Sequence, residues 1–214
     1  MSTSKLAPSV IKSAAPSPDR EWSVFVFNLI APFYRRIDFL HSTHYLNAIA
    51  LVDREVKIRG KTILDVGTGT GDWGAMFNLY QPKEVQGVDF AHRMVETAKI
   101  KHPEIHFSFG NAQHLAGFGD NSFDVVTASF VVHGAKKTAR NNMLREMKRV
   151  TRKYIVLHDF LGPTPPFIRF LELLERSDYK DFKKNIFNEL EEHFTQIQKF
   201  NIKKGSGIYI AHKK

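Results

Sequence analysis

The chain has 214 residues, with 31 Lys and Arg against 22 Asp and Glu, and a formal net charge of +9. Its 43% hydrophobic content suffices for one α/β domain with a core, and no apolar run is long enough to span a bilayer, so we expect a cytoplasmic protein. The absence of cysteine excludes disulfides, thiolate metal sites and cysteine nucleophiles.

The charge is distributed unevenly along the chain. Residues 1–135 carry 13 basic and 13 acidic side chains, whereas residues 136–214 carry 18 and 9. Residues 1–20 are rich in Ser, Ala and Pro, and prolines would interrupt the amphipathic helix of a transit peptide. We therefore predict a flexible tail over residues 1–20 and one domain over residues 21–214.

The segment from Ile63 to Gly74 predicts a strand, a glycine turn and the start of a helix, because Gly67, Gly69 and Gly71 follow an apolar run. Glycine permits positive φ and a close approach of a ligand, and the N–H groups at a helix start attract an anionic group. This pattern favours a nucleotide-like cofactor. A tight turn without a ligand is the alternative.

The spacing of the glycines distinguishes two cofactor classes incompletely. The dinucleotide pattern G-x-G-x-x-G, counted from Gly67, would require glycine at position 72, which is Asp. A frame that starts at Gly69 does match and keeps an NAD-dependent oxidoreductase open. However, G-x-G-x-G with Asp65 just upstream suits a cofactor with a charged amino-acid end and no phosphate.

The segment over residues 84–90 predicts a second strand that ends in an acid at Asp89, 20 residues after Gly69. A carboxylate at this place in a βαβ unit can accept hydrogen bonds from both ribose hydroxyls. After a third strand, Asn111 could offer its carbonyl to an adenine amino group, or it could simply form a turn.

The remaining apolar runs complete a pattern of alternating strands and helices. We predict strands over residues 62–66, 85–89, 105–109, 123–129, 154–158, 194–200 and 207–212. Such alternation builds a parallel sheet, whose ligands gather at the carboxyl ends of the strands. The last two strands form a terminal hairpin within residues 193–214.

These features resemble the class I S-adenosylmethionine (SAM) methyltransferases. Within that superfamily, residues 27–34, 69–72 and 121–130 are similar to the C-methyltransferases of menaquinone and ubiquinone biosynthesis, with the best cover over residues 60–160. Arg35, His133 and the segment 151–153 depart from that group's usual residues. These departures leave the methyl acceptor open.

The resemblance implies a fold, a cofactor and its contacts. The fold is a Rossmann-like seven-stranded, mostly parallel sheet with an antiparallel last strand and helices on both faces. Residues 60–160 would bind SAM, and residues 21–58 and 161–192 would supply acceptor-lid helices. Asp65 would fix the glycine loop. The implied cofactor-binding residues are Asp65, Gly67, Thr68, Gly69, Gly71, Asp89, Phe90, Met94, Asn111, Ala112, Gln113 and Ser129.

The segment Ser129–His133 after the fourth strand constrains the chemistry. It lacks the Asn-Pro-Pro-Tyr type of motif used for amine methylation, and it lacks the carboxylate cluster of a magnesium-dependent catechol enzyme. We therefore predict a metal-independent transfer to carbon or oxygen of a small acceptor.

Three residues are candidates for catalysis. His133 has an intrinsic pKa near neutrality and could accept the acceptor's proton, or it could instead cap a loop or contact the cofactor. His158, next to Asp159, could bind the acceptor or relay a proton. Tyr34 could cover the methionine end of SAM, hydrogen-bond the acceptor, or belong to the core.

Apolar segments at residues 22–30 and 166–174 favour a small aromatic or lipophilic, quinol-like acceptor, although core packing also explains them. Residues 136–150 form a helical pattern with an apolar stripe and a basic face. That face is either solvated or in contact with an anionic membrane, nucleic acid or acidic partner. An RNA methyltransferase and a non-enzymatic SAM-fold partner protein therefore stay open as alternatives.

Overall fold

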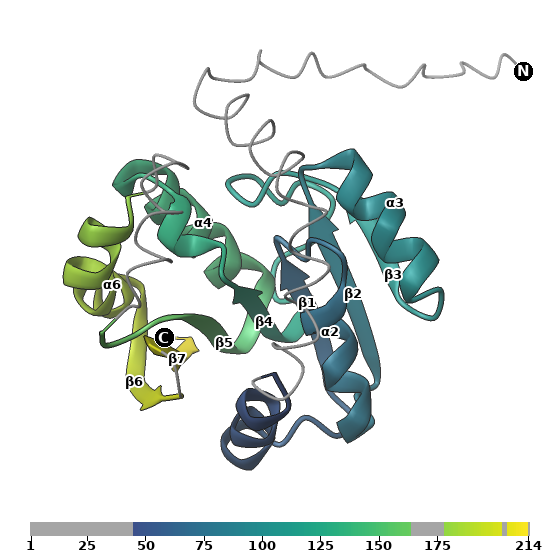
Figure 1. Ribbon diagram of the computed structural model, residues 1–214, viewed down its shortest axis with the longest axis horizontal. Helices are drawn as coiled ribbons and strands as arrows, with labels where there is room; N and C mark the ends of the chain where they lie inside the picture. Colours follow the sequence, from purple (N-terminus) through teal and green to yellow (C-terminus); the bar gives the residue numbers. More distant parts are fainter. Residues whose placement is uncertain (1–44, 164–177, 203–204, 214) are drawn as a thin grey trace, which may run out of the picture.

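The computed structural model describes residues 45–163, 178–202 and 205–213. Seven strands of these residues form one sheet in the order β3-β2-β1-β4-β5-β7-β6, with helices on both faces (Figure 1). The strands are β1 (Thr62–Val66), β2 (Glu84–Asp89), β3 (His106–Phe109), β4 (Phe123–Ser129), β5 (Thr151–Phe160), β6 (Phe194–Asn201) and β7 (Ser206–Lys213).

The pairing of the strands confirms the predicted fold. β1 pairs in parallel with β2 and β4, β2 with β3, and β4 with β5, whereas β7 runs antiparallel to both β5 and β6. The chain leaves β1 toward β2 on one side and returns to β4 on the other. The carboxyl ends of β1 and β4 therefore flank the switch point at which open α/β sheets bind ligands.

Two hydrophobic cores cover the two faces of the sheet. Ile63 of β1 packs into one core with the helical residues 45–56, α2 (Asp72–Met76) and α3 (His92–Lys101). Its neighbour Leu64 packs into the other core with α4 (Lys137–Val150) and α6 (Tyr179–His193). Successive residues of a strand point to opposite faces, so an almost continuous apolar strand supplies both cores.

The predicted apolar stripe of the basic helix is confirmed in α4, where Met143, Leu144, Met147 and Val150 are buried. Two short 3₁₀ helices, η1 (Phe77–Tyr80) and η2 (Val132–Gly134), follow α2 and β4. None of the helices in the described part of the chain is long and apolar enough to cross a bilayer.

The expected tail and most of the expected N-terminal lid lie outside the described residues. Of the segment 161–192, the structure describes residues 161–163 and α6, whose buried residues Phe182, Ile186 and Leu190 pack against the same core as α4.

Candidate active site

The glycine loop connects β1 to α2 with three left-handed residues. Gly67, Gly69 and Gly71 have φ values of 70°, 55° and 86°, a region that L side chains rarely adopt. A Cβ at Gly67 would lie 2.6 Å from Val131, and one at Gly71 would lie 2.7 Å from Phe107, whereas a Cβ at Gly69 would have nothing within 4 Å. The loop is therefore packed against the protein at both ends and open at its middle.

Asp89 lies directly beside the open middle of the loop, as its spacing from Gly69 predicted. Its Oδ2 accepts the Gly69 N–H at 2.9 Å, and its Oδ1 accepts the Ala91 N–H at 2.8 Å. The side chain is buried, and this burial raises its pKa above the ordinary value. Each oxygen retains lone-pair capacity, so the carboxylate fits a diol that donates hydrogen bonds.

Asp65 lies beneath the same loop and is fully buried. Its Oδ2 accepts the Thr68 hydroxyl at 2.6 Å, while its Oδ1 has no hydrogen-bond partner among the described residues. Burial, together with the nearby Asp89 charge, raises the pKa of Asp65 to about 7. A buried carboxylate with one unsatisfied oxygen suits a cationic neighbour, such as a sulfonium or ammonium group.

Asp72, which breaks the dinucleotide pattern, holds the loop against α3. Its carboxylate lies 2.7 Å from Lys101 Nζ and 2.9 Å from His102 Nε2, and it also accepts the Thr70 hydroxyl. Burial alone would raise its pKa, but these hydrogen bonds outweigh burial and lower it. The sequence did not predict these ion pairs of Asp72, because Lys101 and His102 lie 29 and 30 residues further along the chain.

The residues expected near an adenine ring follow β2 and β3. Phe90, Met94, Asn111 and Ala112 are partly exposed, and Gln113 is exposed. The Asn111 side chain accepts the backbone N–H of Gln113 at 3.0 Å, which is the turn geometry of the simpler interpretation. This bond uses one of the two lone pairs of the amide oxygen, so the Asn111 carbonyl can form the turn and still accept a hydrogen bond from an adenine amino group.

A second group of polar side chains lies at the carboxyl ends of β4 and β5. Ser129, expected as a cofactor contact, places its hydroxyl 3.0 Å from His158 Nδ1. The next residue, Phe130, has a φ of 52° and donates its backbone N–H to the His158 carbonyl. A left-handed aromatic residue costs energy, so tertiary contacts hold the chain in this turn.

His158 is almost completely buried among aromatic rings. It stacks on Trp73 with a centroid distance of 4.8 Å, and the rings of Tyr45 and Phe130 meet it edge-on. Trp73 also donates its Nε1–H to Thr127. Trp73 was missed by sequence reasoning, although a large aromatic residue directly after the glycine turn is a usable signal.

His133 lies in η2 and contacts the end of β5. Its Nδ1 is 2.8 Å from Asp159 Oδ1, and its backbone N–H lies 3.3 Å from Asp159 Oδ2. The ring packs edge-on against Phe160 and Phe182. The structure thus separates the two candidate histidines: His158 belongs to the Trp73 cluster, and His133 pairs with Asp159.

Comparison with known proteins agrees with this geometry. Residues 63–154 match the family described as a methyltransferase domain. Residues 63–154 therefore carry the sequence pattern of a methyltransferase domain. This result confirms the predicted class of enzyme domain and, with it, S-adenosylmethionine as the cofactor.

Two curated relatives give the same class. A demethylmenaquinone methyltransferase of Chlorobaculum parvum is 33% identical over 159 residues, which are 71% of this chain and 63% of that protein. A demethylmenaquinone methyltransferase of Paenarthrobacter aurescens is 31% identical over 151 residues, which are 68% of this chain and 58% of that protein. The chain thus matches less than two thirds of the length of either relative.

A solved structure supports the fold. Magnesium protoporphyrin IX methyltransferase from Synechocystis PCC 6803, solved with bound SAM, superposes with a TM-score of 0.69 at 17% identity and covers 94% of this chain and 100% of that one. At this identity the likeness concerns the arrangement of the methyltransferase fold and not its acceptor.

Tyr34, the third catalytic candidate, lies outside the described residues. The described part of the chain contains no group of three or more His, Asp or Glu side chains placed to hold a metal ion.

Some basic side chains of α4 form ion pairs within the protein. Arg140 is fully buried and pairs with Glu189 and Asp181 of α6, at 2.5 and 2.6 Å. Arg149 pairs with Glu146 and Asp120. Contact between the remaining basic side chains and anionic lipid or nucleic acid stays a prediction, which vesicle flotation and a salt-dependent RNA shift assay would test.

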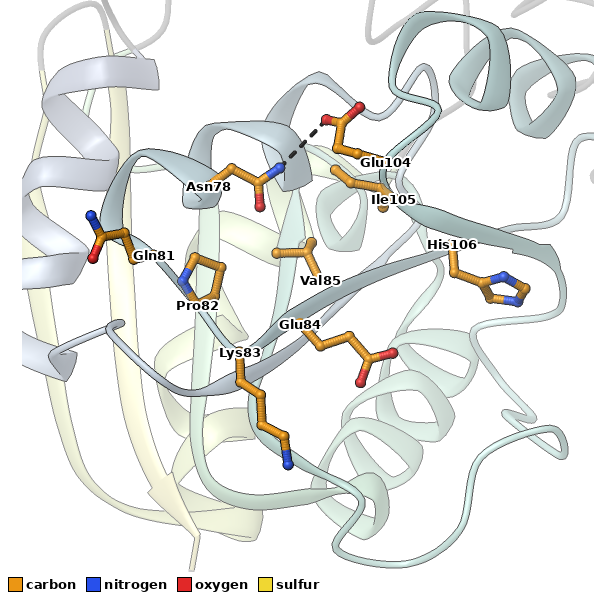
Figure 2. A pocket seen from close by; sticks show the side chains of 9 residues that line it. All are labelled: Asn78, Gln81, Pro82, Lys83, Glu84, Val85, Glu104, Ile105 and His106. Atoms are coloured by element: carbon orange, nitrogen blue, oxygen red, sulfur yellow. Dashed lines mark hydrogen bonds between the residues drawn. The ribbon is translucent and has the colours of Figure 1, made fainter.

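A hollow of about 450 Å³ lies at the amino ends of β2 and β3, at the opposite end of these strands from the glycine loop (Figure 2). Its rim mixes charges, with Lys83 beside Glu84 and with Asn78 donating to Glu104. This position separates the hollow from the candidate active site.

Proposed function

We propose that the protein transfers a methyl group from SAM to carbon or oxygen of a small aromatic or lipophilic, quinol-like acceptor, without a metal ion. The observation that carries this proposal is the position of His133 and His158 among aromatic rings at the ends of β4 and β5. The Phe130 ring contacts both, at centroid distances of 6.3 and 4.6 Å. Aromatic walls with few polar groups suit an aromatic acceptor.

The cofactor supplies an activated methyl group, so the protein has to bind, align and remove a proton. Asp89 would accept hydrogen bonds from the ribose, and the open side of Gly69 would allow close approach of the cofactor. His133 is the group that would accept the acceptor's proton. The names of the curated relatives, demethylmenaquinone methyltransferases, support a quinol among the possible acceptors.

The test is a methylation assay with the purified protein, labelled SAM and a short-chain demethylmenaquinol kept reduced. We expect a singly methylated product, whose methylated atom NMR would identify, and a rate unchanged by EDTA. If neither the quinol nor a panel of simple phenols is methylated while calorimetry shows SAM binding, the proposed acceptor class is wrong. Methylation of RNA by the same preparation would instead support the RNA alternative.

A further inference from the structure

We propose that Asp159 is a positioning residue that holds the His133 imidazole with its proton on Nδ1, so that Nε2 accepts the proton of an aromatic hydroxyl on the acceptor. This inference rests on the proposed function and names the chemical group on which that function acts. It assigns a role to a buried carboxylate that cofactor binding does not use.

The first support is the geometry of the pair. Asp159 Oδ1 lies 2.8 Å from His133 Nδ1, and the same carboxylate accepts the backbone N–H groups of Phe160 at 2.8 Å and His133 at 3.3 Å. Both oxygens therefore face donors. A carboxylate next to an imidazole nitrogen fixes the proton on that nitrogen and leaves the other nitrogen basic.

The second support is the burial of the pair. The Asp159 side chain is 1% exposed and the His133 side chain is 8% exposed, so the imidazole is the member of the pair closer to the surface. Phe160 and Phe182 lie edge-on to the ring at 4.7 and 6.2 Å, and these contacts restrict its rotation. Asp159 thus acts through His133 and does not itself meet an acceptor.

The chemistry balances with an aromatic hydroxyl. As the acceptor's oxygen, or the ring carbon that its ionisation activates, bonds to the methyl carbon, the carbon–sulfur bond breaks and its electron pair stays on sulfur. The hydroxyl proton passes to His133 Nε2, and Asp159 stabilises the resulting imidazolium. In transfer to carbon, the ring carbon then loses its proton to solvent, and the phenolate oxygen regains a proton from the His133 imidazolium, so one proton is released in all.

Other titratable groups surround the pair and bear on any pH dependence. They include His158 and Asp159 on β5, Tyr209 on β7, Tyr179 and Lys183 on α6, and the Arg140–Glu189 pair between α4 and α6. Among these groups, Asp159 lies 2.8 Å from the His133 ring nitrogen Nδ1.

The experiment compares wild type with Asp159→Asn and with Asp124→Asn as the matched control. Asp124 also accepts backbone and hydroxyl hydrogen bonds, from Thr62, but it lies at the opposite end of the sheet. The first readout is the tautomer of His133 in ¹⁵N-histidine-labelled protein, assigned with His133→Gln. We expect Nδ1–H in wild type and in Asp124→Asn, and loss of that tautomer in Asp159→Asn.

The second readout is the pH profile of kcat with the short-chain demethylmenaquinol. Asp159→Asn should lower kcat on the order of 10²- to 10⁴-fold with little change in SAM affinity. It should also move the acidic limb to lower pH, because the imidazolium loses its carboxylate partner. A merely structural role would lower the rate without moving this limb.

The outcomes separate the two proposals. An Nε2–H tautomer in wild type, or an Asp159→Asn variant with unchanged tautomer and pH limb, overturns the role of Asp159. If Asp159→Asn does not fold, the wild-type tautomer alone decides. The expected tautomers without methylation of any quinol or phenol would support the positioning role while overturning the proposed function.

Discussion

The two halves of the sheet build their polar sites differently. In the β1–β3 half, the backbone N–H groups of Gly69 and Ala91 hold Asp89, the carboxylate that we propose binds the ribose. In the β4–β7 half, side chain meets side chain across distant segments, as in Ser129 with His158, 29 residues apart. The β1–β3 half, which we propose binds the cofactor and call the cofactor half, holds the carboxylate that faces the ligand through backbone N–H groups. The β4–β7 half, which we propose binds the acceptor and call the acceptor half, holds its histidines through side chains from distant segments.

The largest expected effect lies in the acceptor half. Arg140→Met leaves Glu189 and Asp181 without their buried cation, and we expect a loss of about 3–5 kcal/mol of unfolding free energy. Urea unfolding measures it. Arg145→Met, on the exposed side of the same helix, is the control and should change stability by less than about 0.5 kcal/mol.

The double variant Arg140→Met/Glu189→Leu sharpens this test. Replacing both partners also removes the buried carboxylate of Glu189, which the single variant leaves without a cation, so part of the lost stability should return. A cost below about 1 kcal/mol for Arg140→Met alone would mean that the acceptor half does not depend on this pair.

The cofactor half should lose binding more than stability. Asp89→Ala removes the carboxylate placed for two ribose hydroxyls. Because hydrogen bonds to a charged group are strong, we expect SAM affinity to fall roughly 100-fold or more. Calorimetric titration with SAM measures the loss. Glu96→Ala, an exposed acid on α3 paired with Lys99, should leave the affinity unchanged, and an unaffected Asp89→Ala variant would disprove the ribose contact.

The buried Asp65 should make the stability of the cofactor half depend on pH. The folded-state pKa of Asp65, about 7, lies above the ordinary 3.8. Its contribution to the free energy of unfolding is therefore present at low pH and is lost as the pH rises through about 7. From pH 4.5 to 8, we expect Asp65→Asn to gain on the order of 3 kcal/mol relative to wild type.

Urea unfolding at several pH values measures this gain. Asp124 provides the control, because hydrogen bonds from Thr62 and Arg152 outweigh its burial and lower its pKa. The contribution of Asp124 to stability is lost only when the pH falls below the ordinary pKa of an aspartate. The difference in unfolding free energy between wild type and Asp124→Asn should therefore stay constant from pH 4.5 to 8. A flat difference for Asp65→Asn as well would contradict the raised pKa.

The smallest effects distinguish two glycines within the loop. Gly69→Ala meets no protein atom within 4 Å and should cost about 1–2 kcal/mol of backbone strain, while its methyl group hinders the cofactor and weakens SAM binding. Gly71→Ala adds a contact of 2.7 Å with Phe107 and should be less stable than Gly69→Ala. The reverse order would show that Gly69 is held by packing.

The fold was largely predictable because its signals are local. The expected strand over residues 62–66 has those bounds, and the expected strand over residues 154–158 lies within the longer β5. The first five strands carry short, mostly apolar runs, and helices separate all of them except β3 and β4. Hydrophobic periodicity and the glycines that end the strands were therefore sufficient to predict them. β5 extends further at both ends because β4 and β7 pair with it along its length.

The candidate site was predictable in part. The glycines and Asp89 follow from one motif and one spacing, and the structure brings them into contact. His133 and His158 were named from their place after strands, but their partners, Asp159 and Trp73, depend on how η2, α2 and β5 pack. No local pattern predicts which of two nearby histidines faces a carboxylate.

The sequence alone determined the class of domain, the cofactor loop and the carboxylate beside it, because backbone conformation and strand order follow from nearby residues. Only the tertiary structure decided that Arg140 is buried in ion pairs with α6 and is not part of a solvated basic face. It also decided that His133, and not His158, pairs with Asp159. The physical reason is that burial and charge pairing are properties of surfaces brought together from distant segments, which a linear pattern does not encode.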